Sequence, residues 1–237
     1  MSVAGQLHGQ GEGAAREVTF EALAAALRAM DTAHAVNDAA GRGARRARRI
    51  VAVAGPPGAG KSTFAARLCA TLCEGRPGRA ALLAMDGYHY DDRVLNARGD
   101  RPRKGAPHTF DIDGLAAMLA RLAADDGREI AVPVFDRSVE IARAGAEIIA
   151  PAARTIVVEG NYLLLDDPAW APLRGFFDAT VMLEVPRAVL VERLSARWHG
   201  YGMDADAILA KLDGNDLPNV DRVLTGCVRA DFRVKNV

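Results

Sequence analysis

Residues suited to phosphate binding stand in the segment Gly55-Pro-Pro-Gly-Ala-Gly-Lys61-Ser62, which matches the pattern G-x-x-x-x-G-K-[ST] in full. Glycines let such a loop turn tightly and point backbone N–H groups at phosphate oxygens, and a helix that begins there adds partial positive charge. We expect Lys61 to reach the terminal phosphates and Ser62 to bind Mg²⁺. The motif therefore predicts binding of ATP and Mg²⁺ by Gly55, Pro56, Pro57, Gly58, Ala59, Gly60, Lys61, Ser62 and Thr63.

Two carboxylates follow apolar runs that read as buried strands. Glu159 comes directly after Thr155–Val158, the place of a metal-linked acidic residue in P-loop proteins, and Asp86 follows the run Ala81–Met85. Ligands of parallel α/β sheets bind beyond the carboxyl ends of the strands, so both groups should face the phosphates. We predict that Glu159 positions Mg²⁺, with a structural ion pair as the alternative. We predict that Asp86 is the general base for an attacking hydroxyl, with Asp91, Asp92 and a simple turn-forming role as its rivals.

Candidates for holding a phosphate acceptor lie in the loops near these strand ends. Aromatic and polar groups directly after Asp86 can stack on a ligand and hydrogen-bond to it, and the loop after the run Ile130–Phe135 lies on the same edge of the sheet. The basic segment Arg98–Lys104 either clamps an anionic substrate or is a solvated loop. The predicted substrate contacts are Tyr88, His89, Arg103, Lys104, Asp136, Arg137, Glu159 and Asn161.

Two arginines four residues apart, Arg193 and Arg197, share one face of a predicted helix over Arg187–Trp198. Arginines on a mobile lid stabilise the transferring phosphoryl group and exclude water. We therefore predict a lid over about residues 187–204 and a catalytic contact between phosphate and at least one of the two arginines. The alternative is an arginine-rich helix face that serves solubility.

The elements that position these residues alternate between short apolar runs and Ala- and Leu-rich helical stretches. Such a pattern is typical of a parallel sheet covered by helices on both faces. We predict an α/β fold of the P-loop NTPase kind, a three-layer sandwich in one domain over residues 18–237, behind a flexible leader, residues 1–17. The predicted strands are Ile50–Ala54, Ala81–Met85, Ile130–Phe135, Thr155–Val158, Ala179–Val185 and Asp231–Val234, and the helices are Thr19–Ala33, Ser62–Cys73, Ile112–Ala124, Arg187–Trp198 and Ala205–Leu212.

Composition narrows the class of partner. Of the 237 residues, 30 are Lys or Arg and 30 are Asp or Glu, and this balance argues against a nucleic-acid partner. The basic segment Gly41–Arg49 is therefore predicted to be a solvated loop. No apolar run approaches the roughly 18 residues of a membrane helix, and the three cysteines do not form a disulfide pattern. We expect a cytoplasmic protein with a small-molecule acceptor and no membrane partner, and the sequence is compatible with a homodimer.

Several motifs in a fixed order resemble the phosphoribulokinase/uridine kinase family, which also contains bacterial pantothenate kinase. Besides the P-loop they are Met85-Asp-Gly-Tyr-His89, Arg103-Lys-Gly-Ala-Pro-His-Thr-Phe-Asp111, Val132-Pro-Val-Phe-Asp-Arg137 and Val158-Glu-Gly-Asn-Tyr162. Together with Gly214-Asn-Asp-Leu-Pro218 and Arg229-Ala-Asp231, they most resemble bacterial fructose transport system kinases, or nucleoside/nucleotide kinase-like proteins.

This resemblance, over about residues 20–235, implies a five-stranded parallel core, a lid around Arg193–Gly202, Asp86 as the catalytic base and Glu159 as the metal-linked residue. Uridine kinases carry an acidic residue for the nucleoside that Gly105-Ala-Pro-His-Thr-Phe lacks, which argues against uridine as the acceptor. The expected function is ATP-dependent phosphorylation of a hydroxyl on a sugar or related metabolite, with a fructose-like sugar as the lead. The alternatives are a nucleoside or pantothenate-type kinase, and a regulatory NTP-binding protein or NTPase without an acceptor.

Overall fold

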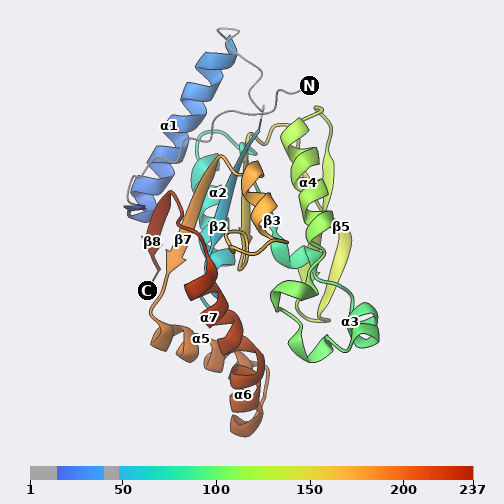
Figure 1. Ribbon diagram of the computed structural model, residues 1–237. Coiled ribbons are helices and arrows are strands. Elements are labelled where there is room, and N and C mark those ends of the chain that lie inside the picture. The colour runs from blue at the N-terminus through green and yellow to red at the C-terminus, as the bar shows by residue number, and fades with distance from the viewer. Residues whose placement is uncertain (1–14, 40–47, 237) are drawn as a thin grey trace, which may run out of the picture.

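A parallel sheet of six strands forms the centre of the computed structural model, which describes residues 15–39 and 48–236 (Figure 1). The strand order is β1-β8-β7-β2-β6-β3, and every neighbouring pair is parallel. This confirms the predicted parallel sheet, with one strand more than expected. The strands are β1 (Arg16–Glu17), β2 (Arg49–Ala54), β3 (Ala80–Ala84), β6 (Thr155–Gly160), β7 (Ala179–Glu184) and β8 (Phe232–Lys235).

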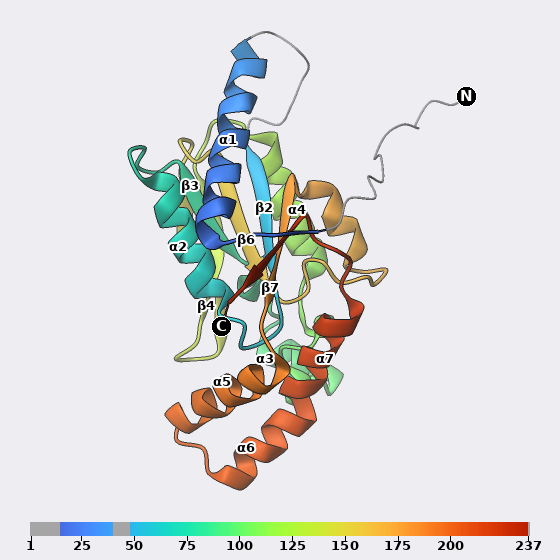
Figure 2. The same cartoon turned by 90° about the vertical axis from the view of Figure 1, so that its left-hand side faces the viewer.

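Helices cover both faces of this sheet, as the alternating pattern predicted (Figures 1 and 2). Side chains of the central strand β2 alternate between two hydrophobic clusters, because successive residues of a strand point to opposite faces. Val51 and Val53 pack with α1 and α2, whereas Ile50 and Ala52 pack with α4. The helices are α1 (Phe20–Ala39), α2 (Lys61–Cys73), α3 (Asp92–Arg98), α4 (Ile112–Ala124), α5 (Arg187–Gly200), α6 (Ala205–Lys211) and α7 (Leu217–Gly226).

Shorter helical turns occupy the carboxyl edge of the sheet. The 3₁₀ turn Met85–Tyr88 follows β3 directly, and a π-helical turn, Leu212–Asp216, joins α6 to α7. Helices α5 and α6 lie together beyond the strand ends, where the lid was expected (Figure 2). Three more 3₁₀ turns span Arg101–Arg103, Pro107–Thr109 and Ala171–Phe176. Across the described ranges, no helix is both long and apolar enough to cross a membrane.

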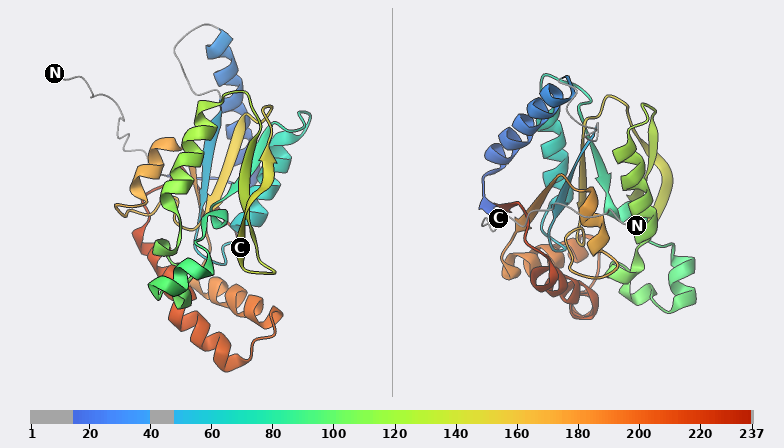
Figure 3. Two further views of the ribbon diagram at one scale, coloured as in Figure 1. Left: turned by 90° about the vertical axis from the view of Figure 1, so that its right-hand side faces the viewer. Right: turned by 45° about the horizontal axis from the view of Figure 1, so that its top comes forward.

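The apolar run Ile130–Phe135 does not join the parallel sheet, so that prediction was wrong. It forms β4 (Ile130–Asp136), which pairs antiparallel with β5 (Ile141–Ile149) in a separate hairpin beside α4 (Figure 3). The turn between them includes Glu140 in the left-handed region, at φ 56°. Strand β5 is largely exposed and therefore lacks the apolar run that marks a buried strand.

Two further expectations changed at the start of the domain. Arg16 and Glu17, assigned to the flexible leader, pair with β8 as strand β1, while residues 1–14 lie outside the described residues. Of the segment Gly41–Arg49, predicted to be a solvated loop, residues 41–47 lie outside the described residues, whereas Arg48 is fully buried. Its Nε lies 3.1 Å from Asp125 Oδ1 and donates to the Ala153 carbonyl, also at 3.1 Å. A buried guanidinium requires such partners, and the sequence pattern does not show them.

Candidate functional site

The phosphate loop has the backbone shape that its glycines allow. Gly58 and Gly60 have φ values of 82° and 77°, in the left-handed region that L-residues with side chains rarely adopt. Asn236, after β8, donates from Nδ2 to the Ala59 carbonyl at 2.7 Å and closes the loop from the other side. A Cβ on Gly60 would lie 2.9 Å from that amide nitrogen. The loop is therefore closely packed around a cradle at the start of α2.

Lys61, the first residue of α2, is buried at the floor of this cradle. Its Nζ donates to the Pro56 carbonyl at 3.0 Å, which folds the side chain back over the loop. Burial lowers the pKa of Lys61 to about 8, although the carboxylates of Glu159 and Asp86 act in the opposite direction. An ammonium group with so little solvation has a strong preference for an anionic partner.

The side chains of Ser62 and Glu159 meet directly. Ser62 Oγ donates to Glu159 Oε1 at 2.9 Å, joining the start of α2 to the end of β6. Burial and then the nearby charge of Asp86 raise the pKa of Glu159, while Lys61 and the Ser62 hydrogen bond oppose the shift. A hydroxyl and a carboxylate in contact beside the cradle are oxygen ligands of the kind that Mg²⁺ prefers, so the residues present fit the ion.

Asp86 stands on the other side of the cradle, at the start of the 3₁₀ turn after β3. Its Oδ2 accepts from the Arg137 guanidinium at 2.8 Å, and its carbonyl lies 2.8 Å from Nδ1 of His89. The end of β6 packs tightly here, since a Cβ on Gly160 would lie 2.5 Å from Met85 Cβ. The absence of a side chain at Gly160 therefore brings Asp86 and Glu159 to the same cradle.

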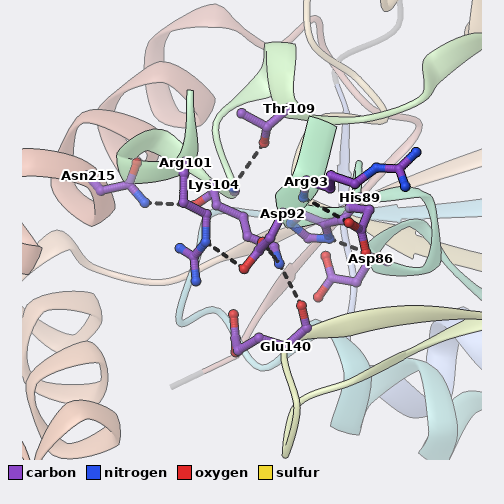
Figure 4. A network of polar contacts seen from close by, with 11 residues as sticks. Asp86, His89, Asp92, Arg93, Arg101, Lys104, Thr109, Glu140 and Asn215 are labelled. Carbon is purple, nitrogen blue, oxygen red and sulfur yellow. Dashed lines mark hydrogen bonds and ion pairs between the residues drawn. The ribbon is translucent and has the colours of Figure 1, made fainter. Parts of the chain in front are cut away.

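Asp91 and Asp92, the alternative candidates for the general base, both make structural contacts. Asp92 Oδ1 accepts from Lys104 Nζ at 2.6 Å and its Oδ2 accepts from Arg101 Nε at 2.7 Å (Figure 4). Although burial acts to raise it, the hydrogen bonds from these two cations hold the pKa of Asp92 below its usual value. Asp91 caps α3 by accepting from the Arg93 N–H at 2.8 Å. Asp86, unlike these two residues, lines the cavity beside the P-loop and is therefore the better candidate for a base.

These groups line one cavity of about 300 Å³ between the P-loop and the helices α5 and α6. It brings together most of the residues predicted from sequence. Its lining includes Pro57, Gly58, Gly60, Lys61, Ser62, Thr63, Asp86, His89, Lys104, Arg137, Glu159, Asn161 and Arg197.

Seven predicted residues do not line this cavity, and three of them, Gly55, Pro56 and Ala59, belong to the P-loop. Arg193 donates to the Asn236 carbonyl at 3.1 Å, so the structure brings only Arg197 of the predicted pair to the cavity. Tyr88 is buried within a hydrophobic cluster, and Arg103 donates to the Gly214 carbonyl at 2.8 Å. Asp136 accepts from Arg143 at 3.2 Å on the far side of the hairpin turn.

The cavity also includes residues that sequence reasoning missed. Phe135 and Glu140 come from the hairpin, Trp198 comes from α5 and Lys211 comes from α6. Trp198 was interpreted only as a packing residue. Arg101 lies in the basic loop that was noted as a whole. Gly105, Asn215 and Asp216 had one signal, the motifs Arg103–Asp111 and Gly214–Pro218 that contributed to the family resemblance, and Asn219 had none.

Comparison with known proteins places this site in a family. The profile of the AAA domain matches residues 50–214, so the chain belongs to that family of P-loop proteins. It is 36% identical over 194 residues to the uncharacterized protein YggC of Escherichia coli (strain K12), covering 79% of this chain and 78% of YggC. It is 31% identical over 196 residues to the “Putative uridine kinase C227.14” of Schizosaccharomyces pombe, covering 78% of this chain and 82% of that protein.

A solved structure confirms the fold. The “putative fructose transport system kinase” from Silicibacter sp. TM1040 aligns with a TM-score of 0.75 and 41% identity, covering 81% of this chain and 91% of that one. Pantothenate kinases are among the other curated relatives, and the chain spans about half of their length. The predicted P-loop kinase fold and the resemblance to uridine kinase-like and fructose transport system kinase-like proteins are both confirmed.

Proposed function

We propose that this member of the AAA-domain family is an ATP-dependent kinase that phosphorylates a hydroxyl of a sugar or a related small metabolite. A phosphotransferase with an alcohol group as acceptor is the enzyme class that its named kinase relatives share. The observation that supports it most is the joint lining of one cavity by the P-loop and Asp86. The loop by itself accounts for nucleotide binding, and a carboxylate beside it is placed to accept the proton of a hydroxyl that enters the same cavity.

In the proposed reaction, the P-loop N–H groups and Lys61 hold the phosphates of ATP, and Arg197 approaches from the lid. Ser62 and Glu159 would hold Mg²⁺, which would neutralise part of the phosphate charge. Asp86 accepts the proton of the acceptor hydroxyl as that oxygen attacks the terminal phosphorus, and the bond from this phosphorus to the bridging oxygen of ADP breaks, so that ADP leaves. Arg137, 2.8 Å from Asp86, holds the carboxylate of the base in place until the acceptor arrives.

The acceptor is proposed to bind in the part of the cavity away from the P-loop. His89, Lys104 and Asn161 line this part from the loops that follow the strands β3 and β6, and all three were proposed from the sequence as substrate contacts. A sugar is the lead, because the relative of solved structure carries a fructose transport name. A nucleoside or pantothenate-type acceptor is equally supported by the names of the other kinase relatives.

The direct test is ADP release from Mg-ATP by the purified protein, measured against sugars, sugar phosphates, nucleosides and pantothenate. We expect strong stimulation by one compound and a phosphorylated product of the corresponding mass. A panel in which every compound leaves the slow water reaction unchanged would instead favour a regulatory NTP-binding protein.

The role of Asp86 is tested by Asp86→Asn, which keeps the size of the side chain and removes its basicity. We expect kcat to fall by roughly 10²–10⁴-fold, the usual contribution of a general base, with the Kd for ATP within about twofold. Asp113→Asn, on the exposed first turn of α4, is the matched control and should behave as wild type. Retained turnover in the Asp86 variant would remove this residue from its role.

A further inference from the structure

Three buried polar side chains from the π-helical turn and the start of α7 face the cavity, and the proposed mechanism assigns them no role. Asn215, Asp216 and Asn219 are 4%, 8% and 3% exposed, and all three line the cavity. A π-helical turn is rare and often occurs at a functional site, because the extra residue changes the direction of the side chains around it. Buried polar groups also require partners, so their hydrogen bonds can be counted.

Asn215 has its partners within the protein. Its Nδ2 donates to the Lys104 carbonyl at 2.9 Å, and its Oδ1 accepts from Asn219 Nδ2 at 3.2 Å. The contact with Lys104 ties this turn to the loop that also carries Arg101, as Figure 4 shows. Asn215 therefore fixes where the turn sits relative to the acceptor side of the cavity.

Asp216 has spare hydrogen-bonding capacity. Its Oδ2 accepts from Trp198 Nε1 at 2.6 Å, and this is the side-chain hydrogen bond of Asp216 within the residues that the structure describes, which leaves Oδ1 to face the cavity. The side-chain amide of Asn219 also has an oxygen left over. Within the same described part of the chain, this amide makes one hydrogen bond, which Nδ2 donates to Asn215. Both residues line the cavity, so both offer oxygen acceptors to whatever enters it.

A carboxylate in this place is costly for the fold. Burial raises the pKa of Asp216, while the Trp198 hydrogen bond, Lys211 and Arg197 oppose that shift without an ion-pair contact. An amide would hold Trp198 equally well through its oxygen, without the cost of burying a charge. The negative charge is therefore not needed to hold the lid helix.

We propose, on the basis of the kinase function above, that Asp216 and Asn219 form a subsite that accepts hydrogen bonds from hydroxyl groups of a neutral, polyhydroxylated acceptor. Hydroxyls are donors that match two unpartnered oxygens. An acceptor with a carboxylate or phosphate at this position would be repelled by Asp216. Of the cations that line the cavity, Arg101 and Lys104 already share Asp92, and the charges of Lys211 and Arg197 already act on Asp216 itself. The subsite thus favours sugars and polyols over sugar phosphates and hydroxy acids.

The test compares neutral acceptors (D-fructose, D-ribose, ribitol) with anionic ones (fructose 6-phosphate, D-glycerate, pantothenate) in wild type and in Asp216→Asn. We expect wild type to prefer a neutral compound. In the variant, kcat/KM for that compound should fall roughly tenfold to hundredfold, the effect of losing one hydrogen bond to a charged group, with KM for ATP within about twofold. Asp213→Asn, exposed on the same turn, is the matched control and should match wild type.

The outcomes separate this inference from the kinase function itself. Two results would overturn the subsite without affecting the kinase proposal. One is that the best acceptor is an anionic compound, and the other is that the Asp216→Asn variant changes KM for ATP instead of kcat/KM for the neutral acceptor. If no compound stimulates ADP release, the kinase proposal fails, and the subsite is judged by thermal stabilisation with the three neutral compounds. Stabilisation that Asp216→Asn abolishes would support the subsite, and its absence in wild type would overturn it.

Discussion

The buried state of Lys61 predicts that nucleotide affinity falls as the pH rises above about 8. Its pKa of about 8 in the free protein means that roughly nine-tenths of the molecules carry the charge at pH 7 and roughly one-tenth at pH 9. Phosphate groups placed against Nζ favour the charged form, so binding must restore the proton. The Kd for Mg-ADP should therefore be about tenfold higher at pH 9 than at pH 7, a change of about 1.4 kcal/mol.

Isothermal titration calorimetry in buffers of different ionisation enthalpy measures both the Kd and the protons taken up. We expect uptake of about 0.9 proton per bound Mg-ADP at pH 9 and about 0.1 at pH 7. Lys61→Arg is the control, because a guanidinium stays charged over this range and should give a flat profile. Equal Kd values and no proton uptake in wild type across this range would refute the argument.

The same shift has the opposite sign for the stability of the protein without nucleotide. The pKa of Lys61 is lowered from 10.5 to about 8, so between these values the unfolded chain binds more protons than the folded one. The contribution of Lys61 to the unfolding free energy should therefore increase, by on the order of 3 kcal/mol in total, as the pH rises through that window. Denaturant unfolding of wild type and of Lys61→Met over this pH range isolates that contribution as the difference between their unfolding free energies.

Two further substitutions test the packing that positions the site. Gly160→Ala places a methyl group 2.5 Å from Met85 Cβ, and should lower unfolding free energy by about 1–3 kcal/mol in urea, whereas Gly175→Ala, with no atom within 4 Å, should not. An unchanged urea midpoint in the first variant would contradict the close approach of β3 and β6. Arg48→Met leaves the buried Asp125 short of a partner and should cost about 3 kcal/mol by the same measurement. No loss would mean that Asp125 is satisfied without Arg48.

The parallel sheet and the phosphate cradle could be predicted from sequence because their signals are local. A loop with glycines at fixed spacing, between an apolar run and a helix, needs no distant residue to be recognised, and Lys61 and Ser62 follow from it. Asp86 and Glu159 could be placed for a related reason. Each stands at the end of an apolar run, Glu159 within the last residues of β6 and Asp86 two residues after β3, and the carboxyl ends of parallel strands meet at one edge.

Contacts between distant segments depended on the tertiary structure. The hairpin β4–β5 was missed because an exposed strand carries no apolar run, and its turn supplies Arg137 to Asp86. Arg193 and Arg197 share a helix period, yet only packing against Asn236 directs one of them away from the cavity.

The hydrogen-bonded cluster around Asp216 is the clearest example of contacts that the sequence could not predict. Its environment comes from Trp198 on the lid and, through Asn215, from Lys104 more than a hundred residues earlier. No spacing rule connects these positions. By itself, the sequence determined which chemistry the loop and strand ends can perform, since those signals are carried by neighbours in the chain. The fold decided which side chains share the cavity, because burial and hydrogen bonding depend on residues that only folding brings together.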